Sequence, residues 1–124
     1  MARVLLIDEE IEVRLFHRVL LEELDGYEVI DVGSGTAAKE VMAHQEVDAV
    51  IVDFQAHDID GPQFMDELRM RRPCLPIIIN TANSRFCDCF PSLETENIVF
   101  KTAGFSDLEN ALNRTAANNS LLPH

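Results

Sequence analysis

The chain has 124 residues, of which 47% are hydrophobic and 26% charged, and its formal net charge at pH 7 is -12. This length suits one globular domain and is too short for two ordinary domains. The acidic balance argues against direct nucleic-acid binding, because affinity for the phosphate backbone comes largely from clustered Lys and Arg. The N-terminus turns acidic at Asp8 after a short apolar run, so we expect no signal peptide, no membrane span and a cytoplasmic location.

Apolar runs of strand length alternate along the chain with segments of helical period. The strand-like runs are residues 4–7, 27–32, 49–52, 76–79 and 98–100. This alternation is typical of repeated βα units. It predicts an α/β protein with a doubly wound, five-stranded parallel sheet in the flavodoxin-like order 2-1-3-4-5 and helices on both faces.

The first three helices have recognisable ends. Apolar residues recur at helical spacing through residues 11–24, and Gly26 is expected to end that helix. Ser34 or Thr36 can cap the second helix, which is expected to end near Gln45. The third helix is expected to start at Gly61-Pro62, since proline suits the first turn.

The last part of the chain gives one clear helix and one irregular segment. Ser106 is predicted to cap the last helix, with Glu109 at capping-box spacing. A fourth helix is expected between residues 82 and 97, but Pro91 interrupts it at a cost of about 3 kcal/mol in a helix interior. We therefore expect the fourth helix to be short, displaced or absent.

Polar side chains follow four of the predicted strands. The third strand ends at Asp53, and the first ends at Asp8 and Glu9. In the predicted order these two strands are neighbours, so the three carboxylates gather at one sheet edge and repel one another. A hard divalent ion relieves this repulsion, and Mg2+ prefers oxygen ligands. The sequence therefore predicts a magnesium site.

The fourth and fifth strands bring a hydroxyl and an ammonium to the other side of Asp53. These groups belong to Thr81 and Lys101, and there they could bind an oxyanion attached to Asp53. Carboxylates serve as nucleophiles that form aspartyl-phosphate intermediates. The pattern thus favours an aspartyl phosphoacceptor.

With these features in place, the chain resembles the receiver domain of bacterial two-component response regulators over nearly its whole length. The resemblance covers residues 1–117 and leaves residues 118–124 as a tail or the start of a linker. It rests on four motifs in the family's order: Val4-Leu-Leu-Ile-Asp8-Glu9-Glu10, Asp48-Ala-Val-Ile-Val-Asp53 with Asp58-Ile-Asp60-Gly61, Ile77-Ile-Ile-Asn-Thr81-Ala82 and Val99-Phe-Lys101.

The resemblance implies a signalling phosphoacceptor that is not an enzyme but promotes its own phosphorylation and dephosphorylation. Asp53 would take a phosphoryl group from a sensor histidine kinase or a histidine phosphotransfer protein. Asp8 and Glu9 would hold Mg2+ directly or through water, and the backbone carbonyl of Gln55 would be a further ligand. The resemblance also implies a downstream protein target, whose identity the sequence does not give.

Several positions depart from the family's pattern. The family commonly has proline at the positions of His57 and Thr102, and often an aromatic residue at Ile98. The resemblance places the output surface on the fourth helix, fifth strand and fifth helix. Its altered residues leave open the alternative of a receiver-like binding module that works without phosphorylation, and a homodimer also stays open as a partner state. A flavodoxin-like flavin carrier is disfavoured, because the acidic loop after the first strand is a poor cradle for a flavin phosphate.

Overall fold

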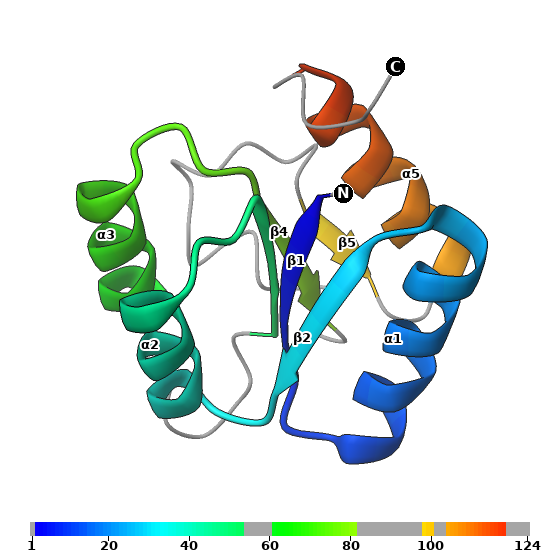
Figure 1. The fold of residues 1–124 in the computed structure, drawn as a ribbon, viewed down its shortest axis with the longest axis horizontal. Helices are drawn as coiled ribbons and strands as arrows, with labels where there is room; N and C mark the ends of the chain where they lie inside the picture. The colour runs from blue at the N-terminus through cyan, green and yellow to red at the C-terminus, as the bar shows by residue number, and fades with distance from the viewer. Residues whose placement is uncertain (1, 54–60, 82–97, 101–103, 119–124) are drawn as a thin grey trace.

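The computed structural model describes residues 2–53, 61–81, 98–100 and 104–118. The elements in these ranges follow one another along the chain as shown in Figure 1: β1 (Arg3–Ile7), α1 (Ile11–Asp25), β2 (Glu28–Val32), α2 (Gly35–His44), β3 (Ala49–Val52), α3 (Gly61–Arg71), β4 (Ile77–Thr81), β5 (Ile98–Phe100) and α5 (Phe105–Asn118). The irregular segment predicted at residues 82–97 lies outside the described residues, and so does the predicted tail 118–124 except for Asn118, which is the last residue of α5.

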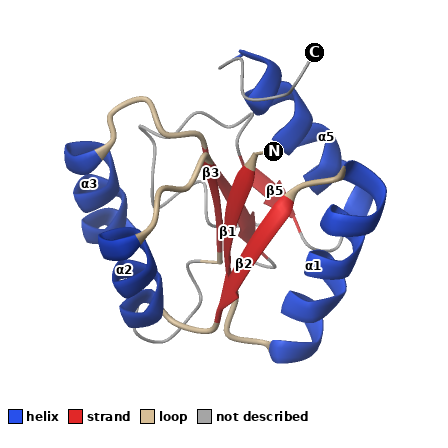
Figure 2. Ribbon diagram, in the orientation of Figure 1, coloured by secondary structure: helices blue, strands red, loops and turns tan. Residues whose placement is uncertain are grey.

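The strands form one parallel sheet in the order β2-β1-β3-β4-β5, as predicted. Helices α2 and α3 cover one face, and α1 and α5 cover the other (Figures 1 and 2). This is the expected doubly wound α/β fold. The carboxyl ends of the strands and the starts of α1 and α2 lie at the lower edge of Figure 1. Within the described ranges, no helix is long and apolar enough to cross a membrane.

A separate apolar core lies on each face of the sheet. On the α1 and α5 face, Leu6 and Ile51 pack with Leu112. On the α2 and α3 face, Val52 packs with Phe64. Because both faces are covered, the strands are nearly continuous apolar runs, which explains why they were recognisable in the sequence.

Four of the predicted helix ends are confirmed and one is wrong. The second helix ends near Gln45 and the third begins at Gly61, as predicted. Gly26 ends α1 in the left-handed conformation with φ 71°, and its N–H donates to the Leu21 carbonyl. Ser34 caps α2, since its side chain accepts from the Ala37 N–H at 3.1 Å. However, α5 begins one residue before the predicted cap, Ser106, which therefore lies inside the first turn. The preceding residue is a glycine with φ 95°, which turns the chain directly into the helix.

The apolar row of α1 faces solvent rather than the sheet. Ile11, Leu15 and Val19 are 57%, 46% and 54% exposed, whereas His17 and Leu21 are the buried residues of this helix. Apolar spacing fixes the helical period but not the rotation of the helix about its axis. That rotation is stabilised by two arginine ion pairs between α1 and β2.

Candidate functional site

Two aspartates lie side by side where the central strands end. Ile7 of β1 pairs with Val52 of β3, and the next residues along the chain are Asp8 and Asp53. The Asp53 N–H donates to the Ile7 carbonyl at 3.0 Å, so the ladder continues to the aspartate. On the other side, the Asp8 N–H donates to the Val32 carbonyl at 3.1 Å. Neighbouring strands are about 4.8 Å apart, so the structure places these two carboxylates together.

Both aspartates are buried at the sheet edge. Asp8 is 1% and Asp53 is 4% exposed. The Asp8 carboxylate is also oriented by its own loop, because its Oδ1 accepts the Glu10 N–H at 2.9 Å. Two buried carboxylates are costly to hold side by side unless opposite charge is supplied. The pair therefore forms a small acidic site, in which the Glu10 N–H orients the Asp8 carboxylate.

Of the other predicted site residues, the structure describes Glu9 and Thr81. Glu9 is exposed in the loop after β1. Thr81 is fully buried as the last residue of β4, two positions beyond the Ile79 that pairs with β3. Gln55 and Lys101 lie outside the described residues.

Asn80 is a buried polar residue to which the sequence reasoning gave no role. It is 3% exposed. The pairing of Val52 with Ile79 puts Asn80 next to Asp53 across the sheet. An amide directly after the three isoleucines of β4 was the available signal, since buried polar groups need specific partners.

The donor set suits Mg2+ better than a softer metal. Within the described ranges, no three His, Cys, Asp or Glu side chains are grouped so that they could hold a metal ion. Mg2+ does not require such a cage, because it keeps several waters and binds through one or two carboxylates with a phosphate oxygen. Asp8 and Asp53 supply those two carboxylates, so the residues present fit this ion.

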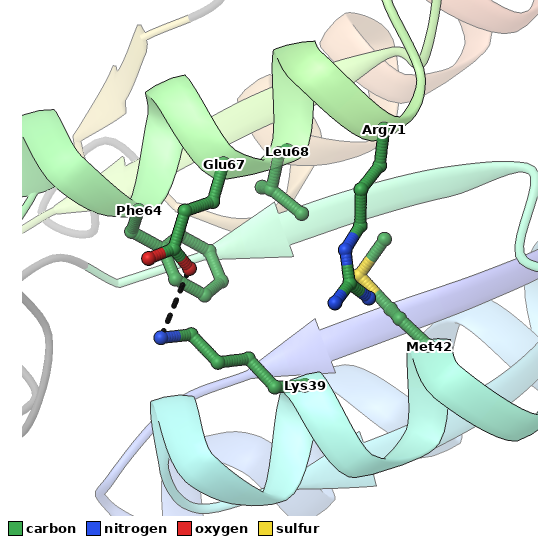
Figure 3. Close-up of a pocket in the computed structure, with 6 residues that line it drawn as sticks. All are labelled: Lys39, Met42, Phe64, Glu67, Leu68 and Arg71. Atoms are coloured by element: carbon green, nitrogen blue, oxygen red, sulfur yellow. Dashed lines mark ion pairs between the residues drawn. The ribbon is translucent and has the colours of Figure 1, made fainter.

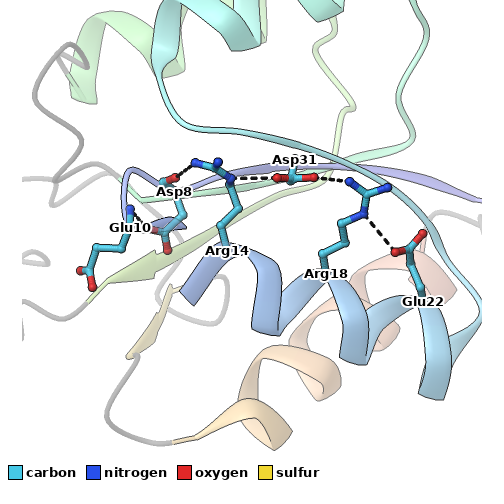
Figure 4. A network of polar contacts seen from close by, with 6 residues as sticks. All are labelled: Asp8, Glu10, Arg14, Arg18, Glu22 and Asp31. Carbon is cyan, nitrogen blue, oxygen red and sulfur yellow. Dashed lines mark hydrogen bonds and ion pairs between the residues drawn. The ribbon is translucent and has the colours of Figure 1, made fainter. Parts of the chain in front are cut away.

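A network of charged side chains connects α1 and β2 next to Asp8 (Figure 4). Arg14 Nε is 2.8 Å from Asp31 Oδ2, and Arg14 Nη1 donates to the Asp8 backbone carbonyl at 2.9 Å. Arg18 binds the other oxygen of Asp31 and also pairs with Glu22 at 3.0 Å. Burial alone would raise the pKa of Asp31, but the hydrogen bonds from the two arginines outweigh it and lower that pKa.

A groove also lies between α2 and α3, away from the paired aspartates (Figure 3). The Lys39 Nζ to Glu67 Oε2 ion pair, 2.9 Å long, spans it, and this interaction lowers the pKa of Glu67. Its lining also includes Met42, Phe64 and Leu68. This groove combines helix packing with a surface ion pair, and it lacks the paired carboxylates found at the sheet edge.

A family model and curated relatives point to the same family. The family model described as "Response regulator receiver domain" matches residues 4–113. Among curated proteins, the chain is 29% identical over 98 residues to the transcriptional regulatory protein GlrR of Escherichia coli K12, covering 74% of this chain and 22% of GlrR. It is 35% identical over 83 residues to the response regulator protein FleR of Pseudomonas aeruginosa, covering 65% of this chain and 17% of FleR. The chain thus spans about a fifth of the length of these relatives.

Solved structures agree in fold over nearly the whole chain. A response regulator receiver domain protein from Clostridium thermocellum has a TM-score of 0.82 and 25% identity, covering 99% of this chain and 100% of that one. The response regulator TrrA from Thermotoga maritima, in complex with Mg(2+)-BeF, has a TM-score of 0.79 and 26% identity, covering 93% and 99%.

Proposed function

This chain belongs to the response regulator receiver domain family, and we propose that its phosphoryl acceptor is Asp53. Receiver domains of this family are signalling phosphoacceptors of two-component systems. The observation that supports the assignment to this residue is the buried pair that Asp53 forms with Asp8 at the carboxyl edge of the sheet. The proposed donor is a phosphohistidine on a sensor histidine kinase or on a histidine phosphotransfer protein.

The proposed reaction follows from the chemistry of the carboxylate. An oxygen of Asp53 forms a bond to phosphorus while the bond from phosphorus to the histidine nitrogen breaks, and that nitrogen leaves with the electron pair. When bound, Mg2+ would neutralise charge on the phosphoryl oxygens and on the carboxylates. Asp8 and Glu9 would hold the ion directly or through water, together with Asp53 and the Gln55 carbonyl.

Two further residues are proposed to act on the phosphoryl group. The Thr81 hydroxyl lies fully buried at the end of β4, where it would donate to a phosphoryl oxygen. Lys101 would pair with the phosphoryl charge by the same family pattern. These residues would promote both phosphorylation and dephosphorylation of Asp53, and would switch the surface that binds a downstream protein or a second copy of the chain.

The alternative of a binding module that works without phosphorylation gains no support from the matched proteins. Such a module would have no need for two adjacent buried carboxylates, whose mutual repulsion costs stability. The phosphoacceptor is therefore the function that the site favours.

The direct test is intact-protein mass spectrometry after incubation with a small phosphodonor such as acetyl phosphate. With Mg2+ we expect the mass of one added phosphoryl group, and with a chelator we expect no gain. Asp53→Asn should abolish labelling, whereas Asp66→Asn is a matched control because Asp66 is an exposed carboxylate on α3. Equal labelling of wild type and Asp53→Asn would refute the assignment.

A further inference from the structure

We infer that Arg14 is a positioning residue. It would hold the peptide between Asp8 and Glu9 so that the side-chain carboxylates of these two residues face Asp53. This inference rests on the proposed function, because it concerns the same magnesium site. Arg14 would touch neither the ion nor the phosphoryl group. It would act through the main chain of Asp8, with its own position set by Asp31 (Figure 4).

The first argument is that hydrogen bonds hold the Asp8 main chain on both sides. Its N–H donates to the Val32 carbonyl at 3.1 Å, and its carbonyl accepts from Arg14 Nη1 at 2.9 Å. The second of these bonds fixes the plane of the peptide that leads to Glu9. Because the Asp8 side chain is also tied to the Glu10 N–H, a rotation of this peptide would displace both carboxylates.

The second argument is that the guanidinium of Arg14 is fixed rather than mobile. Its Nε donates to Asp31 Oδ2 at 2.8 Å, and the two side chains are only 15% and 10% exposed. The planar guanidinium presents several donors in a rigid fork, so one arginine can bind a carboxylate and a carbonyl at once. A side chain with a single donor would have to choose between them.

The third argument is that the chain leaves room for this guanidinium at Gly33. A Cβ added there would lie 2.6 Å from Arg14 Nη1, and 3.9 Å from the Asp8 carbonyl oxygen. The φ of Gly33 is outside the left-handed region, so the backbone itself does not require glycine. The missing side chain at Gly33 therefore provides space for the arginine beside Asp8.

Charge alone predicts the opposite effect, which makes the role testable. Arg14 is a cation close to a cation site, so its removal should tighten Mg2+ binding if only electrostatic repulsion matters. If Arg14 positions Asp8, its removal should weaken binding. Loss of a residue that orients a metal ligand typically costs about 10-fold to 100-fold in affinity, and we expect the lower end because the contact is to the backbone.

Arg18 provides the matched control. It binds the same Asp31 carboxylate from the same helix, but it also pairs with Glu22 and not with Asp8. Its side chain is 40% exposed, so Arg18→Ala should change the Mg2+ dissociation constant by less than about twofold. Both variants remove one positive charge from the same network.

The experiment is a titration of isotopically labelled protein with MgCl2, followed by the amide NMR signals of Asp8, Glu10 and Asp53. Arg14→Ala should raise the dissociation constant about tenfold and should shift the Glu10 amide signal before any Mg2+ is added. Arg18→Ala should do neither. Thermal unfolding without Mg2+ is measured for each variant to separate positioning from general stability.

Gly33→Ala provides a second variant that keeps every charge. Its methyl group should displace the tip of Arg14 and weaken Mg2+ binding in the same direction as Arg14→Ala. In the double variant, Gly33→Ala should add little, because the side chain that it displaces is already gone. This variant also decides the question if Arg14→Ala does not fold.

The outcomes separate this inference from the proposed function. If Mg2+ leaves the Asp8 and Asp53 signals of the wild-type protein unchanged, the proposed magnesium site itself is wrong. If the wild type binds and both Arg14→Ala and Gly33→Ala bind as tightly or more tightly, only the positioning role is overturned. An equal loss in Arg18→Ala would also overturn it, because the effect would then belong to the ion-pair network as a whole.

Discussion

Tyr27 makes the contact between the start of β2 and α5 directly measurable, because it is the one tyrosine in the chain. It is 4% exposed, and its hydroxyl donates to Asn113 Oδ1 at 2.7 Å. Burial, followed by the negative charges of Asp25 and Glu109, raises its pKa to about 12. A raised folded-state pKa means that the protein binds this proton more tightly when folded.

The sign of the stability change follows from this pKa. Below about pH 10 the phenol is protonated in both states, and its contribution to folding is fully present. Above that value the unfolded chain loses the proton first, so stability falls as pH rises through about 12. Between the two pKa values the full linkage is about 1.4 kcal/mol per pH unit, and solvent screening near the hydroxyl reduces it to about 1 kcal/mol per pH unit.

The assay combines phenolate absorbance with denaturant unfolding. A rapid pH jump should show the folded protein ionising near pH 12. Tyr27→Phe should lose about 1 kcal/mol at neutral pH through the missing hydrogen bond. Between about pH 10 and pH 11, it should then lose about 1 kcal/mol less than the wild type, because it carries no phenol to ionise. A midpoint near 10 in the folded protein, or equal alkaline losses in both proteins, would refute the argument.

Two further predictions concern a helix cap and a carboxylate. Ser34→Ala removes the acceptor for the Ala37 N–H and should lower the free energy of unfolding by about 1 kcal/mol. Thr36→Ala should have little capping effect. Equal losses of the two variants in urea unfolding would contradict the assignment of the cap. The pKa of Glu109 is raised by its hydrogen bond to Asp25 and then by burial, so the stability that this group contributes at low pH is lost as pH rises through the raised value. Glu109→Gln should therefore become more stable relative to the wild type from pH 4 to pH 7. If the free energies of unfolding of variant and wild type differ by a constant amount across that range, the interaction of Glu109 with Asp25 is contradicted.

Local chemistry made most of the fold and part of the site predictable. Buried parallel strands are continuous apolar runs, so residues 49–52 could be recognised without knowledge of their neighbours, and the handedness of crossovers then restricts the strand order. Asp8 and Asp53 follow from the same rule, since strand ends meet at one edge of the sheet. The roles proposed for Gln55 and Lys101 stay predictions, because these residues lie outside the described ranges.

What only the tertiary structure decided depends on groups far apart in the chain. The row of Ile11, Leu15 and Val19 has a clear helical period, yet it faces solvent, because spacing carries no information about which side of a helix meets the sheet. The contact of Arg14 with Asp31 and its close approach to Gly33 join α1 to β2 and to the loop that follows β2. Such contacts form only when the sheet brings these segments together, so the residues that would aim the carboxylates could be identified only in the folded protein.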